Sequence, residues 1–300
     1  MGCGTWTASS WTGYSMSRGI DATSTVEELY TSSGMKDDFN PKGVEYRESC
    51  DSADHPNSTP IILGLDVTGS MGHALETVCK KLGDTMGEIL DRNPVTDPQI
   101  MFTAIGDHEY DDAPLQVTQF ESDIRIAEQL NDIWFERGGG GNGGESYLLS
   151  WYFAARHTKT DNYDKRGKKG FIFTVGDECC LPKLPGSAIK EIFGEDAETV
   201  TAEQILAEVS RKYEVYHLIV KPVGYQPVER NWEDLLGKNA VYVENIDNIP
   251  EVIVSILELH AGKTVDEVAN SWDGSTALVV KNAINDLAVT AQNETALVEF

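Results

Sequence analysis

Between residues 59 and 262, short apolar runs alternate with amphipathic patterns of helical period. The apolar runs predict buried strands at residues 60–66, 99–107, 169–178, 213–220 and 240–243. The amphipathic patterns predict helices at residues 75–89, 122–135, 147–156, 201–212, 231–237 and 250–260. A regular alternation of strand and helix is typical of an α/β domain built on a parallel sheet.

One further strand is predicted at residues 115–120, where apolar and polar residues alternate in the sequence Leu-Gln-Val-Thr-Gln-Phe. Such alternation is typical of a strand with one exposed face. The segment follows the strand at 99–107 too closely for a helical crossover between them. We therefore expect this strand to be antiparallel and to lie at an edge of the sheet.

The strand at residues 60–66 ends in the polar sequence Asp66-Val67-Thr68-Gly69-Ser70, and a helical pattern follows at once. In an extended or tightly looped backbone, the side chains of Asp66, Thr68 and Ser70 can converge on one point. One carboxylate and two hydroxyls suit a hard cation and leave room for another ligand. The same residues are also compatible with an ordinary strand-to-helix turn, because Ser and Thr cap helices and Gly permits turns.

Two more predicted strands end in an aspartate, at Gly106-Asp107 and at Gly176-Asp177. If the sheet is parallel, Asp66, Asp107 and Asp177 share one edge of it. Three carboxylates at one edge repel each other unless a cation lies among them. The three strand ends together, rather than Asp66 alone, therefore predict a metal site.

A glycine-rich loop at residues 138–144 leads through Glu145 and Ser146 into the helix predicted at 147–156. A loop of this kind at the start of a helix lets the backbone approach an ion or a phosphate closely. A flexible linker would have the same composition. The loop is not a Walker loop, since no Gly-Lys-Ser/Thr sequence follows it.

Composition narrows the class of protein. The chain has 24 basic and 49 acidic residues, a net charge of −25, which argues against binding to nucleic acid and favours cations or basic partners. No apolar run approaches the roughly 18 residues of a membrane span, and the first residues do not resemble a secretory signal. The five cysteines, with Cys179 and Cys180 adjacent, indicate a reducing compartment rather than a disulfide framework. We expect a cytoplasmic protein.

The chain divides into three predicted parts. Residues 1–58 are rich in Ser, Thr and Gly, and we expect them to form an arm that lies on the core through Trp6, Trp11 and Tyr14. The alternative is that part of this arm is disordered. Residues 59–262 form the α/β domain. Residues 263–300 are predicted to be a helical tail, which a capping box of Thr264 and Glu267 opens.

The sequence Asp66-x-Thr68-x-Ser70, with a later Asn142 and Asp177, resembles a von Willebrand factor A (vWA) domain with a metal-ion-dependent adhesion site (MIDAS). The stretch from Gly106-Asp107-His108 to the glycine-rich loop and Glu145 is similar to the A domains associated with atypical alpha-kinases. The resemblance covers about residues 58–262 and includes no kinase domain.

This resemblance implies a doubly wound, mostly parallel, Rossmann-like sheet with helices on both faces. The metal-site residues that it implies are Asp66, Thr68, Ser70, Asn142 and Asp177. The two hydroxyls would contact Mg²⁺ directly, and the two aspartates would act partly through water. Asp107, Glu145 and Ser146 are expected to support these ligands. Two hydroxyls and few carboxylates favour Mg²⁺ over Ca²⁺, with Mn²⁺ and Ca²⁺ as alternatives.

The function implied is that of a non-enzymatic binding module, in which a Glu or Asp of a partner protein completes the coordination of the ion. The resemblance points to a MoxR-type AAA ATPase, or to another copy of this chain, as the partner. One alternative is a Mg²⁺-dependent phosphohydrolase or phosphotransferase with Asp66 as its nucleophile. However, Lys80 and Lys81 lie in a helix that leads away from the strand end. The other alternative is a metal-free scaffold of the same fold.

Overall fold

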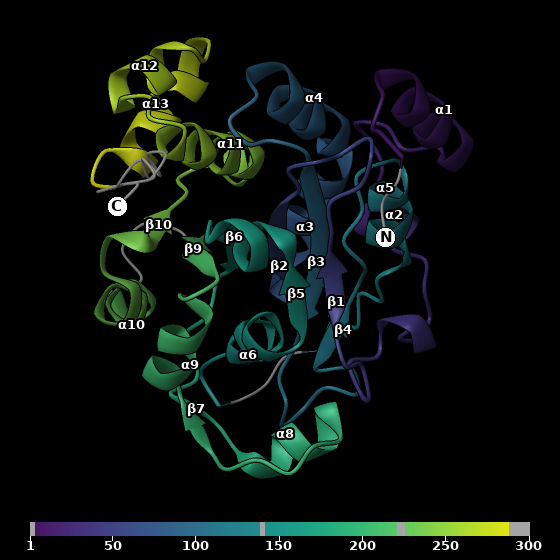
Figure 1. Cartoon of the computed structure of the whole chain (residues 1–300), viewed down its shortest axis with the longest axis vertical. Helices are drawn as coiled ribbons and strands as arrows, with labels where there is room; N and C mark the ends of the chain where they lie inside the picture. The colour runs from purple at the N-terminus through teal and green to yellow at the C-terminus, as the bar shows by residue number, and fades with distance from the viewer. Residues whose placement is uncertain (1–3, 139–141, 221–225, 288–300) are drawn as a thin grey trace, which may run out of the picture.

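The computed structural model describes residues 4–138, 142–220 and 226–287. At its centre is a six-stranded sheet with the strand order β10–β9–β6–β2–β3–β4 (Figure 1). These strands are β2 (Thr59–Asp66), β3 (Pro98–Ile105), β4 (Leu115–Val117), β6 (Gly170–Gly176), β9 (Tyr213–Ile219) and β10 (Ala240–Tyr242). All pairs are parallel except β3 with β4. The predicted doubly wound, mostly parallel sheet with one antiparallel edge strand is confirmed.

The chain builds this sheet outward from β2 in two directions. It first adds β3 and β4 on one side, and later β6, β9 and β10 on the other. The order therefore reverses between β2 and β6, which pair in register up to Leu65 and Val175. In open α/β sheets, ligands bind beyond the carboxyl ends of the strands at such a reversal. The sequence that follows β2 begins at this position.

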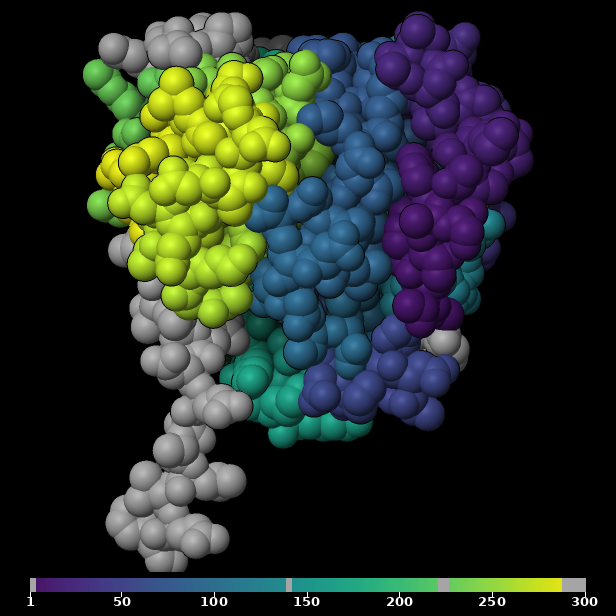
Figure 2. Space-filling view, turned by 90° about the horizontal axis from the view of Figure 1, so that it is seen from above, coloured from purple at the N-terminus to yellow at the C-terminus, as the bar shows by residue number. Residues whose placement is uncertain are grey.

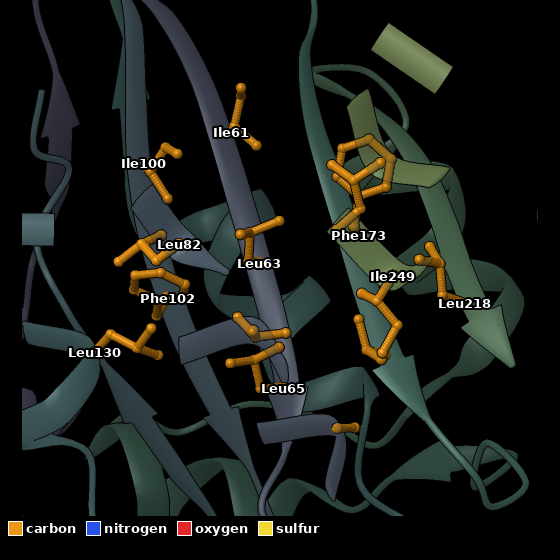
Figure 3. Close-up of a cluster of buried hydrophobic side chains, with 14 of the residues drawn as sticks. Ile61, Leu63, Leu65, Leu82, Ile100, Phe102, Leu130, Phe173, Leu218 and Ile249 are labelled. Atoms are coloured by element: carbon orange, nitrogen blue, oxygen red, sulfur yellow. The ribbon is translucent and has the colours of Figure 1, made fainter. Parts of the chain in front are cut away.

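Helices cover both faces of the sheet, because alternate side chains of each central strand point into different cores. Ile61, Leu63 and Leu65 belong to one core and Ile62 to the other, and Figure 3 shows part of the first. The first core is covered by α2 (Val26–Leu29), α3 (Gly72–Lys80), α4 (Leu82–Arg92), α5 (Arg125–Asp132) and α11 (Ile249–His260). The second is covered by α6 (Leu148–Arg156), α8 (Gly186–Phe193), α9 (Ala202–Val209) and α10 (Gln226–Leu236).

The prediction of a single continuous helix at residues 75–89 is wrong. The structure has two helices, α3 and α4, which meet at Lys81, whose φ and ψ are −90° and 2°. The apolar positions on both sides of this break are buried as predicted, namely Leu75, Val78, Leu82, Met86 and Ile89. Because the apolar spacing continues through Lys81, the pattern gave no sign of the break.

The edge strand β4 also differs from its prediction, since neither of its faces is exposed. The Gln116 side chain is fully buried and makes two hydrogen bonds with the backbone of Trp134, at 2.8 and 2.9 Å. Arg47 donates a hydrogen bond to the carbonyl of Val117 at 3.4 Å. A glutamine whose polar atoms are hydrogen-bonded in the interior gives the same alternating sequence pattern as an exposed glutamine, so the sequence could not distinguish the two.

The amino-terminal arm contains α1 (Ala8–Arg18), the short helix η1 (Asp37–Phe39) and β1 (Arg47–Ser49), which pairs with β5 (Thr158–Thr160). Trp6 is buried and stacks on Trp11, with ring centroids 5.8 Å apart. The Tyr14 hydroxyl donates to Asn131 at 2.9 Å. Helix α1 was not predicted, because the arm has few aliphatic residues. Residues 1–3 lie outside the described chain.

At the other end of the chain, α12 (Val265–Asn270) and α13 (Gly274–Ile284) pack against α11. The capping box of Thr264 and Glu267 is present, as predicted. Helix α13 ends at Ile284, and residues 288–300 of the predicted helical tail lie outside the described chain. The remaining elements are α7 (Asp161–Arg166), β7 (Lys183–Leu184), β8 (Val200–Thr201), η2 (Gly69–Met71), η3 (Gly237–Asn239) and η4 (Ile246–Asn248). Among the helices within the described residues, none has the length and apolar character to cross a membrane.

Candidate metal centre

Asp66 is the last residue of β2 and is fully buried. Its Oδ1 accepts hydrogen bonds from the Thr68 backbone N–H at 2.9 Å and the Thr68 hydroxyl at 2.6 Å. Its Oδ2 accepts one from the Tyr147 hydroxyl at 2.8 Å. Burial raises the pKa of Asp66 to about 7, and the nearby Asp177 carboxylate adds to the rise, while the three hydrogen bonds oppose it. Both oxygens of this carboxylate are thus held in place.

Two hydroxyls connect Asp66 to the end of the neighbouring strand. The hydroxyl oxygens of Thr68 and Ser70 lie 3.4 Å apart, and the Ser70 hydroxyl donates to Asp177 Oδ1 at 3.1 Å. Thr68 is buried, Asp177 is partly exposed and Ser70 is exposed, so this chain of oxygens runs from the interior to solvent. It crosses from β2 to β6, where the strand order reverses. Four of the predicted residues are therefore brought together at the expected edge.

Asn142 belongs to a different hydrogen-bonded group. Its amide nitrogen donates to Asp107 Oδ2 at 2.6 Å and to Glu109 Oε2 at 3.3 Å, and its amide oxygen accepts from the Gly144 N–H at 3.4 Å. Within the described residues it makes no hydrogen bond to Thr68 or Ser70. The structure thus joins Asn142 to Asp107, beyond the end of β3. Of the predicted glycine-rich loop, residues 139–141 lie outside the described chain.

Ser146 and Glu145 occupy the start of the segment that leads into α6. The Ser146 hydroxyl accepts from the His108 backbone N–H at 3.0 Å and lies 2.7 Å from His108 Nδ1, so it holds the loop that follows Asp107. Glu145 is only 4% exposed, and its Oε2 has no hydrogen-bond partner within the described residues. Burial raises the pKa of Glu145 to about 9, and the Asp66 and Asp107 carboxylates raise it further.

Tyr147 is the residue of this site that sequence reasoning missed. Its ring lies edge-on to His217 and Trp232, with centroids 4.9 and 5.2 Å away, and those two rings stack 3.5 Å apart. Gly176 makes room for it, because a Cβ at that position would lie 1.9 Å from the Tyr147 hydroxyl. A tyrosine directly after Glu-Ser at the start of a helix has no distinctive spacing, so the sequence alone offered no signal for this role.

The basic side chains that follow the strand end in α3 and just after it make their contacts elsewhere. His73 is exposed, with its Nε2 3.4 Å from Asp247. Lys80 pairs with Glu76 at 3.1 Å, and Lys81 pairs with Glu251 at 2.7 Å. These lysines point away from the strand end, as predicted, and neither contacts the Asp66 group. The carboxyl ends of β2 and β6 therefore carry carboxylates and hydroxyls.

This set of donors fits a hard divalent cation. Within the described residues, no group of three or more His, Cys, Asp or Glu side chains is arranged as a metal site. The Thr68–Ser70–Asp177 chain offers instead two neutral hydroxyls and one partly exposed carboxylate. Mg²⁺ prefers such oxygen ligands, takes few of them from protein and keeps several waters.

The raised pKa values of Asp66 and Glu145 predict how the metal-free protein responds to pH. Both pKa values are higher in the folded protein than in the unfolded chain, so the folded state binds more protons and its stability falls as the pH rises. The stabilisation contributed by the two raised pKa values is fully present below about pH 4, the pKa range of these groups in the unfolded chain. It is lost as the pH rises through about 7 for Asp66 and about 9 for Glu145.

We therefore expect the chelator-treated protein to be less stable at pH 9 than at pH 7. The loss is at most about 1.4 kcal/mol per pH unit for each proton released. In Glu145→Gln this loss should shrink, because the side chain keeps its shape and cannot ionise. Urea unfolding of both proteins at the two pH values measures it. Equal losses in the two proteins would show that Glu145 does not titrate in this range.

Comparisons with known proteins match no family model and no curated protein sequence. Among solved structures, the pilus adhesin SpaC from Lactobacillus rhamnosus GG is 12% identical, with a TM-score of 0.43 over 76% of this chain and 31% of SpaC. BatB from Bacteroides thetaiotaomicron is 15% identical, with a TM-score of 0.43 over 69% of this chain and 100% of BatB.

Proximal thread matrix protein 1 from the mussel byssus is 10% identical, with a TM-score of 0.44 over 70% of this chain and 48% of that protein. Another structure of the byssus protein is described as having a zinc-occupied MIDAS motif. This chain spans about a third of the length of SpaC and about half of that of the byssus protein. At such identities the similarity concerns the fold alone, which is assigned here from the sheet order of the chain itself.

Proposed function

We propose that this protein is a metal-dependent binding module of the vWA type, which holds Mg²⁺ beyond the ends of β2 and β6. The observation that carries this proposal is the chain of oxygens from Asp66 through Thr68 and Ser70 to Asp177. It lies at the reversal of strand order, where ligands of open α/β sheets bind. Its donors are those that suit a hard cation.

The roles of the residues follow from their hydrogen bonds. Thr68 and Ser70 would offer their hydroxyl oxygens to the ion. Asp66 would act through Thr68, because both of its carboxylate oxygens already accept hydrogen bonds. Asp177 would act through Ser70 or through water. Asn142 remains a predicted ligand through its amide oxygen, while its amide nitrogen donates to Asp107.

The bound ion would supply an open coordination position that a carboxylate can take. Few protein ligands leave waters on Mg²⁺, and an acidic side chain of a partner can replace one of them. We therefore propose a partner that presents a Glu or Asp. From the resemblance stated above, a MoxR-type AAA ATPase or a second copy of this chain is proposed as that partner, and Mn²⁺ or Ca²⁺ as the alternative ions.

Phosphoryl transfer is the less well supported function for the same residues. A nucleophilic aspartate needs a free oxygen that faces the substrate, whereas both oxygens of the buried Asp66 are engaged. Lys80 and Lys81 form ion pairs elsewhere. Neither lysine is therefore placed to hold a phosphate beside Asp66.

Calorimetric titration of the metal-free protein with Mg²⁺ and with Mn²⁺ tests the metal site. We expect one saturable site, and no hydrolysis of p-nitrophenyl phosphate by the loaded protein. Hydrolysis that requires Asp66 would establish the phosphohydrolase reading instead. Absence of binding for both ions would leave the metal-free scaffold as the remaining reading.

The open coordination position can be tested before any partner is known. Bound Mn²⁺ accelerates the relaxation of water protons, so displacement of a coordinated water by acetate should reduce this enhancement. Acetamide has the same size but lacks the charge, and should reduce it much less. An enhancement that acetate leaves unchanged would mean that the ion is structural and does not bind a partner carboxylate.

A further inference from the structure

A groove of about 590 Å³ lies between the amino-terminal arm, α4, α11 and the carboxyl-terminal helices. Its lining includes Trp11 of the arm, Trp272 of the tail and the α4 residues Asp84, Gly87 and Asp91. We call it the α4 groove. Figure 2 shows the face that carries it, with the arm in purple, α3 and α4 in blue and the carboxyl-terminal helices in yellow. The proposed metal site does not account for this groove.

Tryptophans form two walls of the α4 groove and are held in place by the fold. The Trp11 indole stacks on Trp6 and lies against Gly83, where a Cβ would come within 2.0 Å of its Nε1. The Trp272 indole donates to the Ser255 hydroxyl at 2.9 Å and carries the Arg92 guanidinium over its ring at 3.9 Å. Both rings remain partly exposed. Fixed, partly exposed indoles offer apolar area at low entropic cost.

The floor of the groove is one face of α4. Asp84, Gly87 and Asp91 follow each other at helical spacing, so they lie in a row along this face. Gly87 has open space where a Cβ would be, which leaves a gap between the two aspartates. The aspartates are two turns apart, about 10 Å along the helix axis.

The groove is lined by acidic side chains, of which some form ion pairs and others do not. Glu251 is paired with Lys81, and Glu88 with Arg92. Within the described part of the chain, Asp84 and Asp91 are exposed and have no ion-pair partner. Two tryptophans flanking two unpaired carboxylates complement a ligand that is both cationic and apolar.

We propose that the α4 groove docks a basic, amphipathic segment of a partner protein. Lysine or arginine side chains two helical turns apart would pair with Asp84 and Asp91, and apolar side chains between them would fill the gap at Gly87 and contact Trp11 and Trp272. The groove is separate from the proposed metal site, because α4 leads to the start of β3, whereas the metal site lies beyond the carboxyl end of β2, which runs parallel to β3. Figure 1 shows α4 beside these two strands. A second copy of this chain is a poor occupant, since each copy carries a net charge of −25.

The probe is a fluorescently labelled peptide of about 14 residues, four helical turns, in which leucine and lysine alternate at helical spacing. A second peptide carries glutamate in place of lysine. A third keeps the lysines but has serine in place of leucine. We expect the first peptide to bind in fluorescence anisotropy, the second not to bind and the third to bind more weakly. Binding should weaken as salt is added.

Variants distinguish the groove from general attraction to an acidic protein. Asp84→Asn with Asp91→Asn should weaken binding by about fivefold, as expected for two partly exposed ion pairs. The matched control, Asp54→Asn with Glu198→Gln, removes the same charge at exposed positions outside the groove, and should change affinity by less than about twofold. Trp11→Phe with Trp272→Phe should remove the change in tryptophan emission that accompanies binding.

Several outcomes would overturn the proposal. The first is absence of binding by the leucine–lysine peptide, and the second is equal weakening in the groove variant and its control. The third is loss of binding in an Asp66→Ala, Ser70→Ala variant with the groove intact, which would assign the peptide to the proposed metal site. Finally, a dimer in light scattering that the Asp84→Asn, Asp91→Asn variant abolishes would assign the groove to self-association.

Discussion

The double variant Asp66→Ala, Ser70→Ala is expected to bind Mg²⁺ at least about 100-fold more weakly than the wild type, or about 2.7 kcal/mol. The first substitution removes the carboxylate that holds the Thr68 hydroxyl at 2.6 Å. The second removes a proposed ligand and the donor to Asp177. Calorimetric titration of both proteins with Mg²⁺ and Mn²⁺ measures the change.

The matched control for this experiment is Asp54→Ala with Ser187→Ala, two exposed positions outside the proposed ligand set. It removes the same two functional groups and should bind metal as the wild type does. Ser70→Thr keeps a hydroxyl and should retain more affinity than Ser70→Ala. If the double variant bound metal as tightly as its control, the ion would have to be held elsewhere and the proposed ligand set would be wrong.

The sequence predicted the centre of the sheet well because buried parallel strands are nearly continuous apolar runs. Each run ended at a change to polar residues, which located Asp66, Asp107 and Asp177 at strand ends. The parallel pairing of β3, β2 and β6 then brings these ends to one edge. For these residues, position along the chain was sufficient to predict position in space.

Other features depend on contacts that sequence spacing does not encode. Tyr147 meets Asp66 because it caps the start of α6, which packs against β3, and Asn142 binds Asp107 rather than the Ser70 group. Both contacts depend on how loops fold over the strand ends. The burial of edge strand β4 was missed for the same reason. The Gln116 side chain is satisfied by the backbone of Trp134, a contact that sequence spacing does not reveal.

The contact between Gly176 and Tyr147 leads to the second large effect. Gly176→Ala is expected to lower the free energy of unfolding by about 3 kcal/mol, the upper range for overpacking a buried site. The new methyl would lie 1.9 Å from the Tyr147 hydroxyl and 2.5 Å from its Cζ. Tyr147 would have to move, and Asp66 would lose the hydrogen bond to its Oδ2. Urea unfolding measures the stability, and Mg²⁺ titration should show a weaker site.

A double-mutant cycle separates this contact from a general backbone effect. In a Tyr147→Ala background, Gly176→Ala should cost less than about 1 kcal/mol, so the two substitutions should couple by about 2 kcal/mol. Gly13→Ala, in α1 where a Cβ meets nothing within 4 Å, should instead raise stability by about 0.5–1 kcal/mol. An equal cost of Gly176→Ala in both backgrounds would place the strain in β6 itself. In that case the glycine would be required by its own strand, and Tyr147 would hold Asp66 without depending on it.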